Sequence, residues 1–104
     1  MSAFTVFAIL KFKPEFIDTV VEIMKGPKGI ILSKQAKNNL FFDFCLDADG
    51  SNTVRTFEQW KSREDWEAYM QLRDEDGQLV AVHGFDFAWL VEPPQFFPGV
   101  SLSP

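Results

Sequence analysis

The sequence has one cysteine, one histidine and few basic residues for its length. The lone Cys45 cannot form an internal disulfide, so nothing in the sequence indicates an oxidising compartment. Ten Lys and Arg stand against fifteen Asp and Glu, which gives a net charge of −5. That charge opposes binding to nucleic-acid phosphates or to anionic lipid. We therefore expect no nucleic-acid partner and no membrane partner.

The sequence motifs that bind metals and common cofactors are also missing. No His and Cys residues have zinc-ligand spacing, and there is no glycine-rich phosphate loop, dinucleotide fingerprint or nucleophile elbow. The stretch DADGSN at 47–52 is acidic, but its glycine stands at the fourth position, where a calcium loop needs it at the sixth. We interpret DADGSN as a hairpin turn, and we expect neither a metal site nor a bound cofactor.

Long hydrophobic runs are absent as well. The opening MSAFTVFAILKFK has no basic stretch ahead of its apolar run, and that run is too short to cross a bilayer. A chain of 104 residues fits a single domain, which we assign to residues 1–104. We expect a cytoplasmic protein.

Aromatic residues are what the sequence has in excess. Twelve Phe, three Trp and one Tyr make up 15% of the chain. So much π-rich surface has to be buried inside the domain, between subunits or against a ligand. The stretch TFEQWKSREDWEAYM at 56–70 concentrates two Trp, one Tyr and a Glu, and it is either part of the core or one wall of a pocket.

Apolar periodicity predicts the secondary structure. Period-two alternation predicts strands at 4–12, 40–47, 54–60 and 95–102, with Pro98 confining the last strand to an edge. Spacings of three and four predict a helix from Pro14 to Met24, a short helix at 27–36, and a helix from Ser62 to about Arg73 that starts with a capping box. Residues 78–91 fit a helix or a strand, and we favour an irregular helix disturbed at Gly84.

The order strand, helix, strand, strand, helix, strand predicts an α+β fold. It is the ferredoxin-like plan, a four-stranded antiparallel sheet with helices on one face. The first strand is apolar on both faces, and the chain has no further element to cover the second face. A second copy packing sheet against sheet would cover it, so we expect a homodimer, a dimeric α+β barrel.

The segment FEQWKSREDWEAYMQLR resembles the antibiotic biosynthesis monooxygenase-like family of dimeric α+β barrels. In that family the third strand ends in Glu-x-Trp, and a polar turn and an aromatic-bearing helix follow. The matching residues here are Glu58, Trp60, Ser62, Glu64, Trp66 and Tyr69, and a looser likeness extends over residues 3 to 101. The resemblance implies cofactor-free oxygenation of a small aromatic, anthrone-like or quinol substrate, held in a cleft between the sheet and the helices.

The candidate catalytic residues are Glu58, Tyr69 and His83. Glu58 would serve as a base if it is buried, and the Tyr69 hydroxyl would stabilise a substrate oxyanion. His83 is the only side chain whose ordinary pKa lies near neutrality. Each has a structural alternative: a paired strand carboxylate, a core tyrosine and a surface histidine. Family members often carry a histidine where this chain has Tyr69, so a His-dependent mechanism does not transfer directly.

The candidate substrate-binding residues are Trp60, Trp66, Arg73 and Phe7. The two tryptophans would form pocket walls or simply be core residues. Arg73 would hold a phenolate or carboxylate, or pair with Glu58 or with the acidic run at 74–76. As alternatives to the oxygenase we keep a non-catalytic ligand-binding or structural dimer, a haem-binding or haem-degrading relative, and an isomerase or cyclase. Haem-binding relatives share a tryptophan at the position of Trp60 but also use an asparagine on the first strand. This first strand has none, so we rank the haem hypothesis last of the first three.

Overall fold

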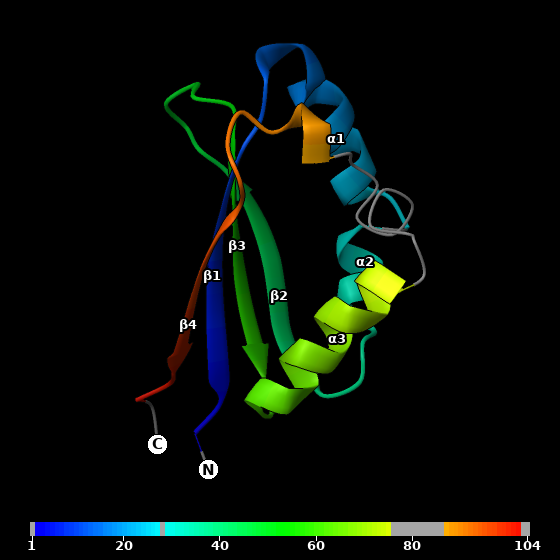
Figure 1. Ribbon diagram of the computed structural model, residues 1–104, viewed down its shortest axis with the longest axis vertical. Coiled ribbons are helices and arrows are strands. Elements are labelled where there is room, and N and C mark those ends of the chain that lie inside the picture. Colours follow the sequence, from blue (N-terminus) through cyan, green and yellow to red (C-terminus); the bar gives the residue numbers. More distant parts are fainter. Residues whose placement is uncertain (1, 28, 76–86, 103–104) are drawn as a thin grey trace.

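A four-stranded antiparallel sheet forms one layer of the protein (Figure 1). The computed structural model describes residues 2–27, 29–75 and 87–102. The strands are β1 (Phe4–Lys11), β2 (Asn39–Leu46), β3 (Thr53–Trp60) and β4 (Gln95–Val100). Their order across the sheet is β2-β3-β1-β4. The central place of the first strand and the edge place of the last are both confirmed.

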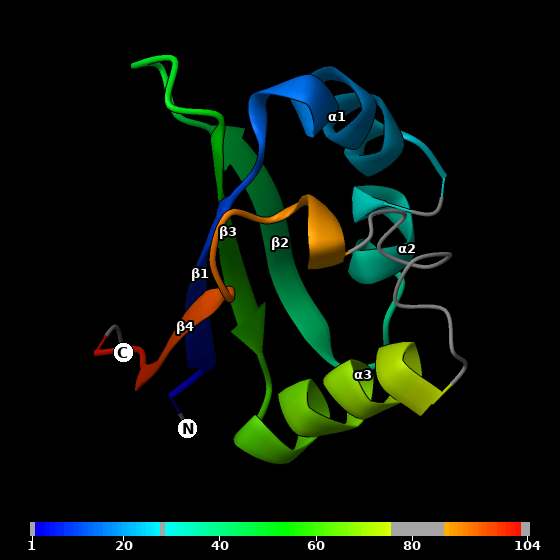
Figure 2. The same ribbon diagram turned by 45° about the horizontal axis from the view of Figure 1, so that its top comes forward.

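The helices form the second layer, on one face of the sheet (Figures 1 and 2). A 3₁₀ turn, η1 (Pro14–Phe16), leads into α1 (Ile17–Lys25), and α2 (Ile30–Lys34), α3 (Arg63–Glu75) and a second 3₁₀ turn, η2 (Phe87–Trp89), follow. This arrangement confirms the ferredoxin-like α+β fold. None of the helices in the described ranges is long and apolar enough to cross a membrane.

Residues 76–86, which include most of the expected irregular helix at 78–91, lie outside the described residues. For the described residues of that range the helical interpretation holds at 87–89 and is wrong at Leu90 and Val91. Residues 87–89 form only the η2 turn, and Leu90 makes an isolated β-bridge with Phe12. The cause is backbone pairing with the end of β1, in which Lys13 N–H donates to the Trp89 carbonyl over 2.8 Å and Val91 N–H to the Lys11 carbonyl over 2.9 Å. The short helix expected at 27–36 is also reduced, to α2.

Alternate residues of β1 explain where the core lies. Phe4, Val6, Ala8 and Leu10 face the helices and are buried. The opposite face of the strand is open in the single chain, where Phe7 is 47% exposed. Strand β2 is less buried than its alternation suggests, because it is the other edge of the sheet and Leu40 and Leu46 are exposed.

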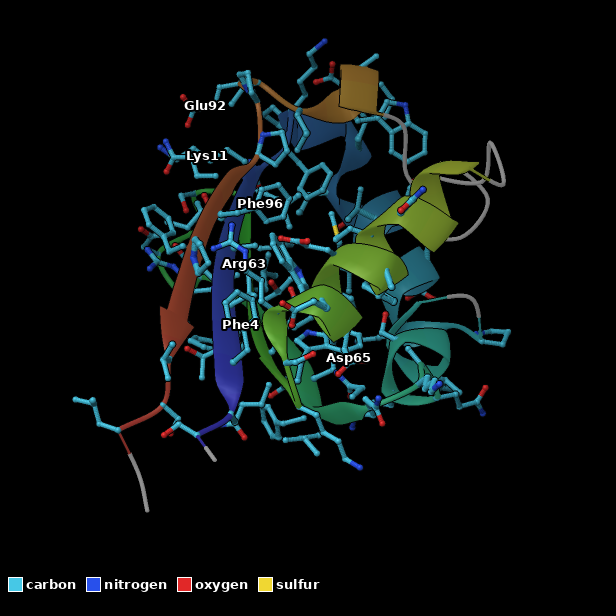
Figure 3. All side chains as sticks on the ribbon, turned by 60° about the horizontal axis from the view of Figure 1, so that its bottom comes forward. Phe4, Lys11, Arg63, Asp65, Glu92 and Phe96 are labelled. Carbon is cyan, nitrogen blue, oxygen red and sulfur yellow. The ribbon has the colours of Figure 1, made fainter. Side chains whose placement is uncertain are left out.

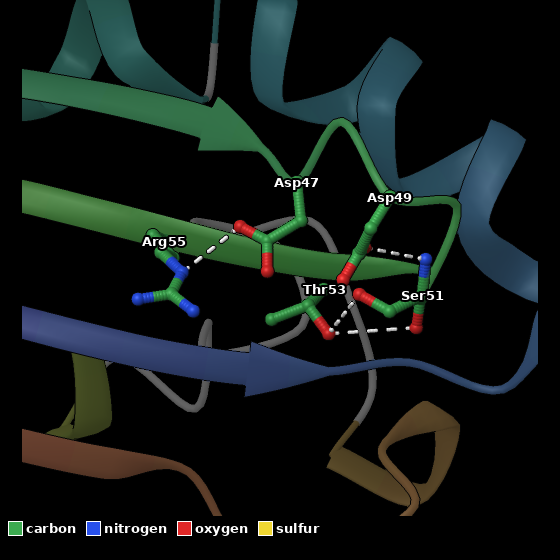
Figure 4. A network of polar contacts seen from close by, with 5 residues as sticks. All are labelled: Asp47, Asp49, Ser51, Thr53 and Arg55. Carbon is green, nitrogen blue, oxygen red and sulfur yellow. Dashed lines mark hydrogen bonds and ion pairs between the residues drawn. The ribbon is translucent and has the colours of Figure 1, made fainter.

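The hairpin between β2 and β3 is the turn that DADGSN predicted (Figure 4). Asp49 Oδ1 accepts a hydrogen bond from Ser51 N–H over 2.9 Å, and Ser51 Oγ donates to Thr53 Oγ1 over 2.9 Å. Across the base of the turn, Arg55 pairs with Asp47 at 2.9 Å. Gly50 takes a φ of +76°, which a residue with a side chain adopts only under strain.

The start of α3 is fixed by a cap. Ser62 Oγ accepts a hydrogen bond from Asp65 N–H over 3.2 Å and donates to Asp65 Oδ2 over 2.7 Å. Asn38, whose φ is +64°, donates from Nδ2 to Asp65 Oδ1 over 2.9 Å. These hydrogen bonds from Asn38 and Ser62 lower the pKa of Asp65 below its ordinary value of 3.8. The cap thereby ties α3 to the residue before β2 and sets the helix across the end of the sheet.

Candidate active site

Strand β3 presents a row of polar and aromatic side chains to the helices. Thr56, Glu58 and Trp60 are two residues apart, so they share one face of the strand. All three are buried; Glu58 is 5% exposed and Trp60 has no exposed surface. A carboxylate is therefore held inside the domain, where such groups are rare unless they have hydrogen-bond partners.

Neighbouring side chains on the same strand supply hydrogen bonds to Glu58. Trp60 Nε1–H donates to Glu58 Oε1 over 3.1 Å, and Thr56 Oγ1–H donates to Glu58 Oε2 over 3.2 Å. These donors, on different oxygens, orient the carboxylate plane. The structure thus uses the indole of Trp60 for more than its apolar surface.

Helix α3 brings Tyr69 over this row. Its ring centroid lies 4.8 Å from that of Trp60 and 6.2 Å from that of Phe42 on β2. Its hydroxyl oxygen is 2.7 Å from Ser33 Oγ of α2, and either hydroxyl can be the donor. Ser33 Oγ also lies 3.4 Å from the Gly29 carbonyl oxygen. Tyr69 is therefore a core residue, as its structural alternative held, and its hydroxyl is hydrogen-bonded inside the domain.

Ser33 was missed by sequence reasoning. It is completely buried, yet a serine in a short helix with lysine and glutamine neighbours has the pattern of a surface residue. Its burial follows from the packing of α2 against β2. That contact is not visible from periodicity.

A small cavity lies between the sheet and the helices, next to the carboxylate and the phenol. Its volume is about 40 Å³. The polar lining residues are Thr56, Glu58 and Tyr69, and the others are Ala8, Leu10, Met24, Phe42, Phe44, Met70 and Phe96. Sites for drug-sized ligands usually measure about 300–1,000 Å³, so a ring substrate enters only if lining side chains move. Unbranched methionines are suited to such movement.

Trp66 stands beside this cavity, one turn of α3 before Tyr69. Its ring centroid is 5.7 Å from that of Phe4 and 6.3 Å from that of Phe96. The guanidinium carbon of Arg63, the first residue of α3, lies 5.9 Å from the centroid of the Phe4 ring, and Figure 3 shows Phe4 and Phe96 on the strands beside this helix. The Trp66 Nε1 atom is buried and has no hydrogen-bond partner among the described residues.

The structure brings only some of the expected site residues together. Trp60 contacts both Glu58 and Tyr69, and Trp66 packs against the same core cluster. Phe7 lies on the opposite face of the sheet, where it packs edge-on against Phe57 with ring centroids 5.2 Å apart. It cannot share this cavity, because successive side chains of a strand point to opposite faces.

The other two candidates lie outside the described part of the chain. His83 belongs to residues 76–86, and the structure describes the backbone of Arg73 but not its side chain. Their expected roles stay predictions. In the described ranges, no group of three or more His, Cys, Asp or Glu side chains is placed to hold a metal ion.

The protein is a ferredoxin-like α+β domain in which a buried carboxylate and a buried phenol line one largely apolar cavity. The family model for antibiotic biosynthesis monooxygenases matches residues 3–74, about two thirds of the sequence. The chain belongs to this family.

Solved structures show the same fold. Rv0793 from Mycobacterium tuberculosis has a TM-score of 0.77 at 16% identity, covering 99% of this chain and 98% of its own. The ActVA-Orf6 monooxygenase of Streptomyces coelicolor, solved in complex with nanaomycin D, has a TM-score of 0.72 at 16% identity, covering 99% and 90%. A Nitrosomonas europaea protein provisionally described as an antibiotic biosynthesis monooxygenase has a TM-score of 0.72 at 21% identity, covering 96% and 99%. No curated protein sequence matches the chain significantly.

Proposed function

We propose that the protein is a monooxygenase that uses neither metal nor organic cofactor and oxidises a small electron-rich aromatic, anthrone-like or quinol substrate. The observation that carries the proposal is that Glu58 and Tyr69 line the same largely apolar cavity, in a chain of a monooxygenase family. The likeness in fold to a monooxygenase solved with nanaomycin D supports a small organic ligand.

For an anthrone-like substrate the reaction converts a ring CH₂ and O₂ into a ring C=O and H₂O. Removal of one proton from the CH₂ leaves a carbanion that is stabilised as its enolate. The enolate passes one electron to O₂, and the two radicals combine to form a C–O bond. The resulting peroxide takes up a proton, and the second CH proton then leaves together with hydroxide as water. Both electron pairs of the former C–H bonds thereby reduce O₂, and one oxygen atom stays on the ring.

In this proposal Glu58 accepts the first proton. Its oxygens are oriented by Trp60 and Thr56, and a carboxylate that lines the cavity is a suitable general base for a substrate held there. The proton it accepts can return to the peroxide.

In this proposal the Tyr69 hydroxyl stabilises the enolate oxygen. Its contact with Ser33 over 2.7 Å holds the phenol in place before the substrate arrives, and with Ser33 as the donor of that bond the phenol proton is available to the enolate. A donor positioned in advance stabilises developing charge without further reorganisation. The apolar lining keeps water away from the carbanion, which would otherwise be reprotonated.

The test is oxygen consumption by purified, metal-stripped protein offered anthrones and quinols. Glu58→Gln and Tyr69→Phe should each lower kcat by roughly 10²–10³-fold, because each removes one proton acceptor or oxyanion donor. Ser62→Ala is the matched control, since it weakens the helix cap at a distance from the cavity lining. The proposal fails if no ring substrate consumes oxygen, or if the two cavity variants turn over like the control.

The small cavity favours one alternative, a ligand-binding or structural protein that retains the fold without turnover. A volume of about 40 Å³ fits a closed core better than an open active site. Anaerobic titration with the same ring compounds separates the two. Binding without oxygen consumption would establish the alternative, and a parallel haem titration followed by its absorption band tests the haem-binding reading.

We also propose that two copies assemble through the uncovered sheet face. Phe7 and Phe97 are 47% and 50% exposed there, and with Phe57 they line a hollow of about 270 Å³. Apolar patches of this kind are seldom left in water. Sedimentation at micromolar concentration should give a dimer, and Phe57→Lys should give a monomer; a monomeric wild type would overturn the assembly.

A further inference from the structure

The indole N–H of Trp66 is an unexplained feature of the molecule. Its Nε1 atom is buried without a hydrogen-bond partner in the described ranges. Buried donors without a partner are uncommon in folded proteins, because each loses its hydrogen bond to water and gains nothing in return. Trp60 provides the internal comparison, since its buried N–H donates to Glu58 over 3.1 Å.

The place of Trp66 connects this N–H to the cavity. Tyr69 and Met70, three and four residues later on α3, both line the cavity, and residues at these spacings lie on one helix face. Phe96 also lines the cavity and packs against Trp66, with ring centroids 6.3 Å apart. The Trp66 indole therefore lies behind the Phe96 side of the cavity wall.

Phe96 is the residue of that wall whose side chain has room to move. It belongs to the edge strand β4 and is 38% exposed, so its ring can turn toward solvent without opening the core. The cavity of about 40 Å³ has to enlarge before any ring compound enters. Movement of Phe96 would enlarge it toward the indole N–H.

We propose that Trp66 determines substrate specificity by donating its Nε1–H to a hydroxyl or carbonyl oxygen on the ring of the substrate that does not react. The ligand class is a compound of at least two fused rings with an oxygen at each end, one toward Glu58 and Tyr69 and the other toward Trp66. Trp66 and Tyr69 are three residues apart on α3, about 4.5 Å along the helix axis, and a two-ring skeleton is the smallest ligand that we propose to reach both side chains. This inference rests on the proposed function of the cavity.

The test compares two naphthols by calorimetry without oxygen, so that neither is oxidised. In the wild type, 2,6-dihydroxynaphthalene should bind roughly tenfold more tightly than 2-naphthol, because its second hydroxyl gives the buried donor a partner. Trp66→Phe keeps a ring in place and should abolish that preference. Phe96→Ala should strengthen binding of both compounds and keep the preference.

A readout on the ligand-free protein guards against a merely structural role. Because the Trp66 N–H has no partner in the described ranges, Trp66→Phe should lower the melting temperature less than Trp60→Phe. The inference is overturned if the wild type binds neither naphthol or does not distinguish them. It is also overturned if Trp66→Phe keeps the preference, or if it destabilises the free protein as much as Trp60→Phe does.

Failure of this inference and failure of the oxygenase proposal give different results. A Trp66-dependent preference in binding, with no oxygen consumption by any ring substrate, would leave the specificity role standing and remove the oxygenase. Oxygen consumption that depends on Glu58 and Tyr69, with no Trp66-dependent preference, would do the reverse.

Discussion

Replacing Trp60 by phenylalanine tests whether the indole holds the buried carboxylate. The variant keeps an aromatic ring but removes the N–H that donates to Glu58 over 3.1 Å. Trp60 has no exposed surface, so losing the pyrrole part of the ring costs about 2 kcal/mol. Losing a hydrogen bond to a carboxylate costs roughly a further 1.5–3 kcal/mol. The free energy of unfolding should therefore fall by about 3.5–5 kcal/mol.

The assay is urea unfolding, with thermal unfolding in parallel. For a domain of this size the expected loss corresponds to a fall in Tm of roughly 15–25 °C. Trp66→Phe is the control, because it makes the same chemical change where the N–H has no partner in the described ranges. The difference between the two variants should be at least the bond to Glu58, about 1.5–3 kcal/mol, since Trp60 is also more deeply buried than Trp66. Equal losses in the two variants would refute the reasoning.

Three further predictions concern the supports of the fold. Ser62→Ala should lower the free energy of unfolding by about 1 kcal/mol in urea, through loss of the α3 cap; an unchanged midpoint would contradict the cap. Gly50→Ala should cost about 1–2 kcal/mol, because φ is +76° there, whereas Gly50→Asn should cost less. The lowered pKa of Asp65 means that its carboxylate stabilises the fold at neutral pH, and this contribution is lost as the pH falls from the ordinary value of 3.8 through the lowered one. Acid titration of stability should be shallower in Asp65→Asn, and identical curves would contradict the role of Asn38 and Ser62 as its donors.

Much of the fold could be predicted because strand periodicity and turn chemistry are local properties. Period-two alternation placed the first strand correctly, but because both of its faces are apolar it did not show which face the helices cover. Pro98 correctly placed the last strand at an edge, since proline cannot donate to a second neighbour. The residues just before that strand could not be predicted the same way. Their shape depends on hydrogen bonds between Lys11, Lys13 and the 89–91 backbone, which no local pattern encodes.

In the candidate site, too, only the relations between residues close in sequence could be predicted. Glu58 and Trp60 could be placed on one face from their spacing alone, and their hydrogen bond follows from that placement. Tyr69 could be placed on the inner face of its helix, but its partner Ser33 is 36 residues away in sequence. Phe7 was a candidate because it is aromatic and lies on a central strand. Strand parity puts it on the other face of the sheet, where the proposed dimer would cover it.

The central claim is that Glu58 and Tyr69 at the apolar cavity oxidise an electron-rich ring with O₂ alone. The most direct measurement is oxygen consumption by metal-stripped wild type and by Glu58→Gln, with an anthrone as substrate and the quinone product quantified. The account predicts one quinone formed for each O₂ consumed, with turnover roughly 10²–10³-fold lower in Glu58→Gln. No oxygen consumption above the uncatalysed rate, or equal turnover by the variant, would contradict it.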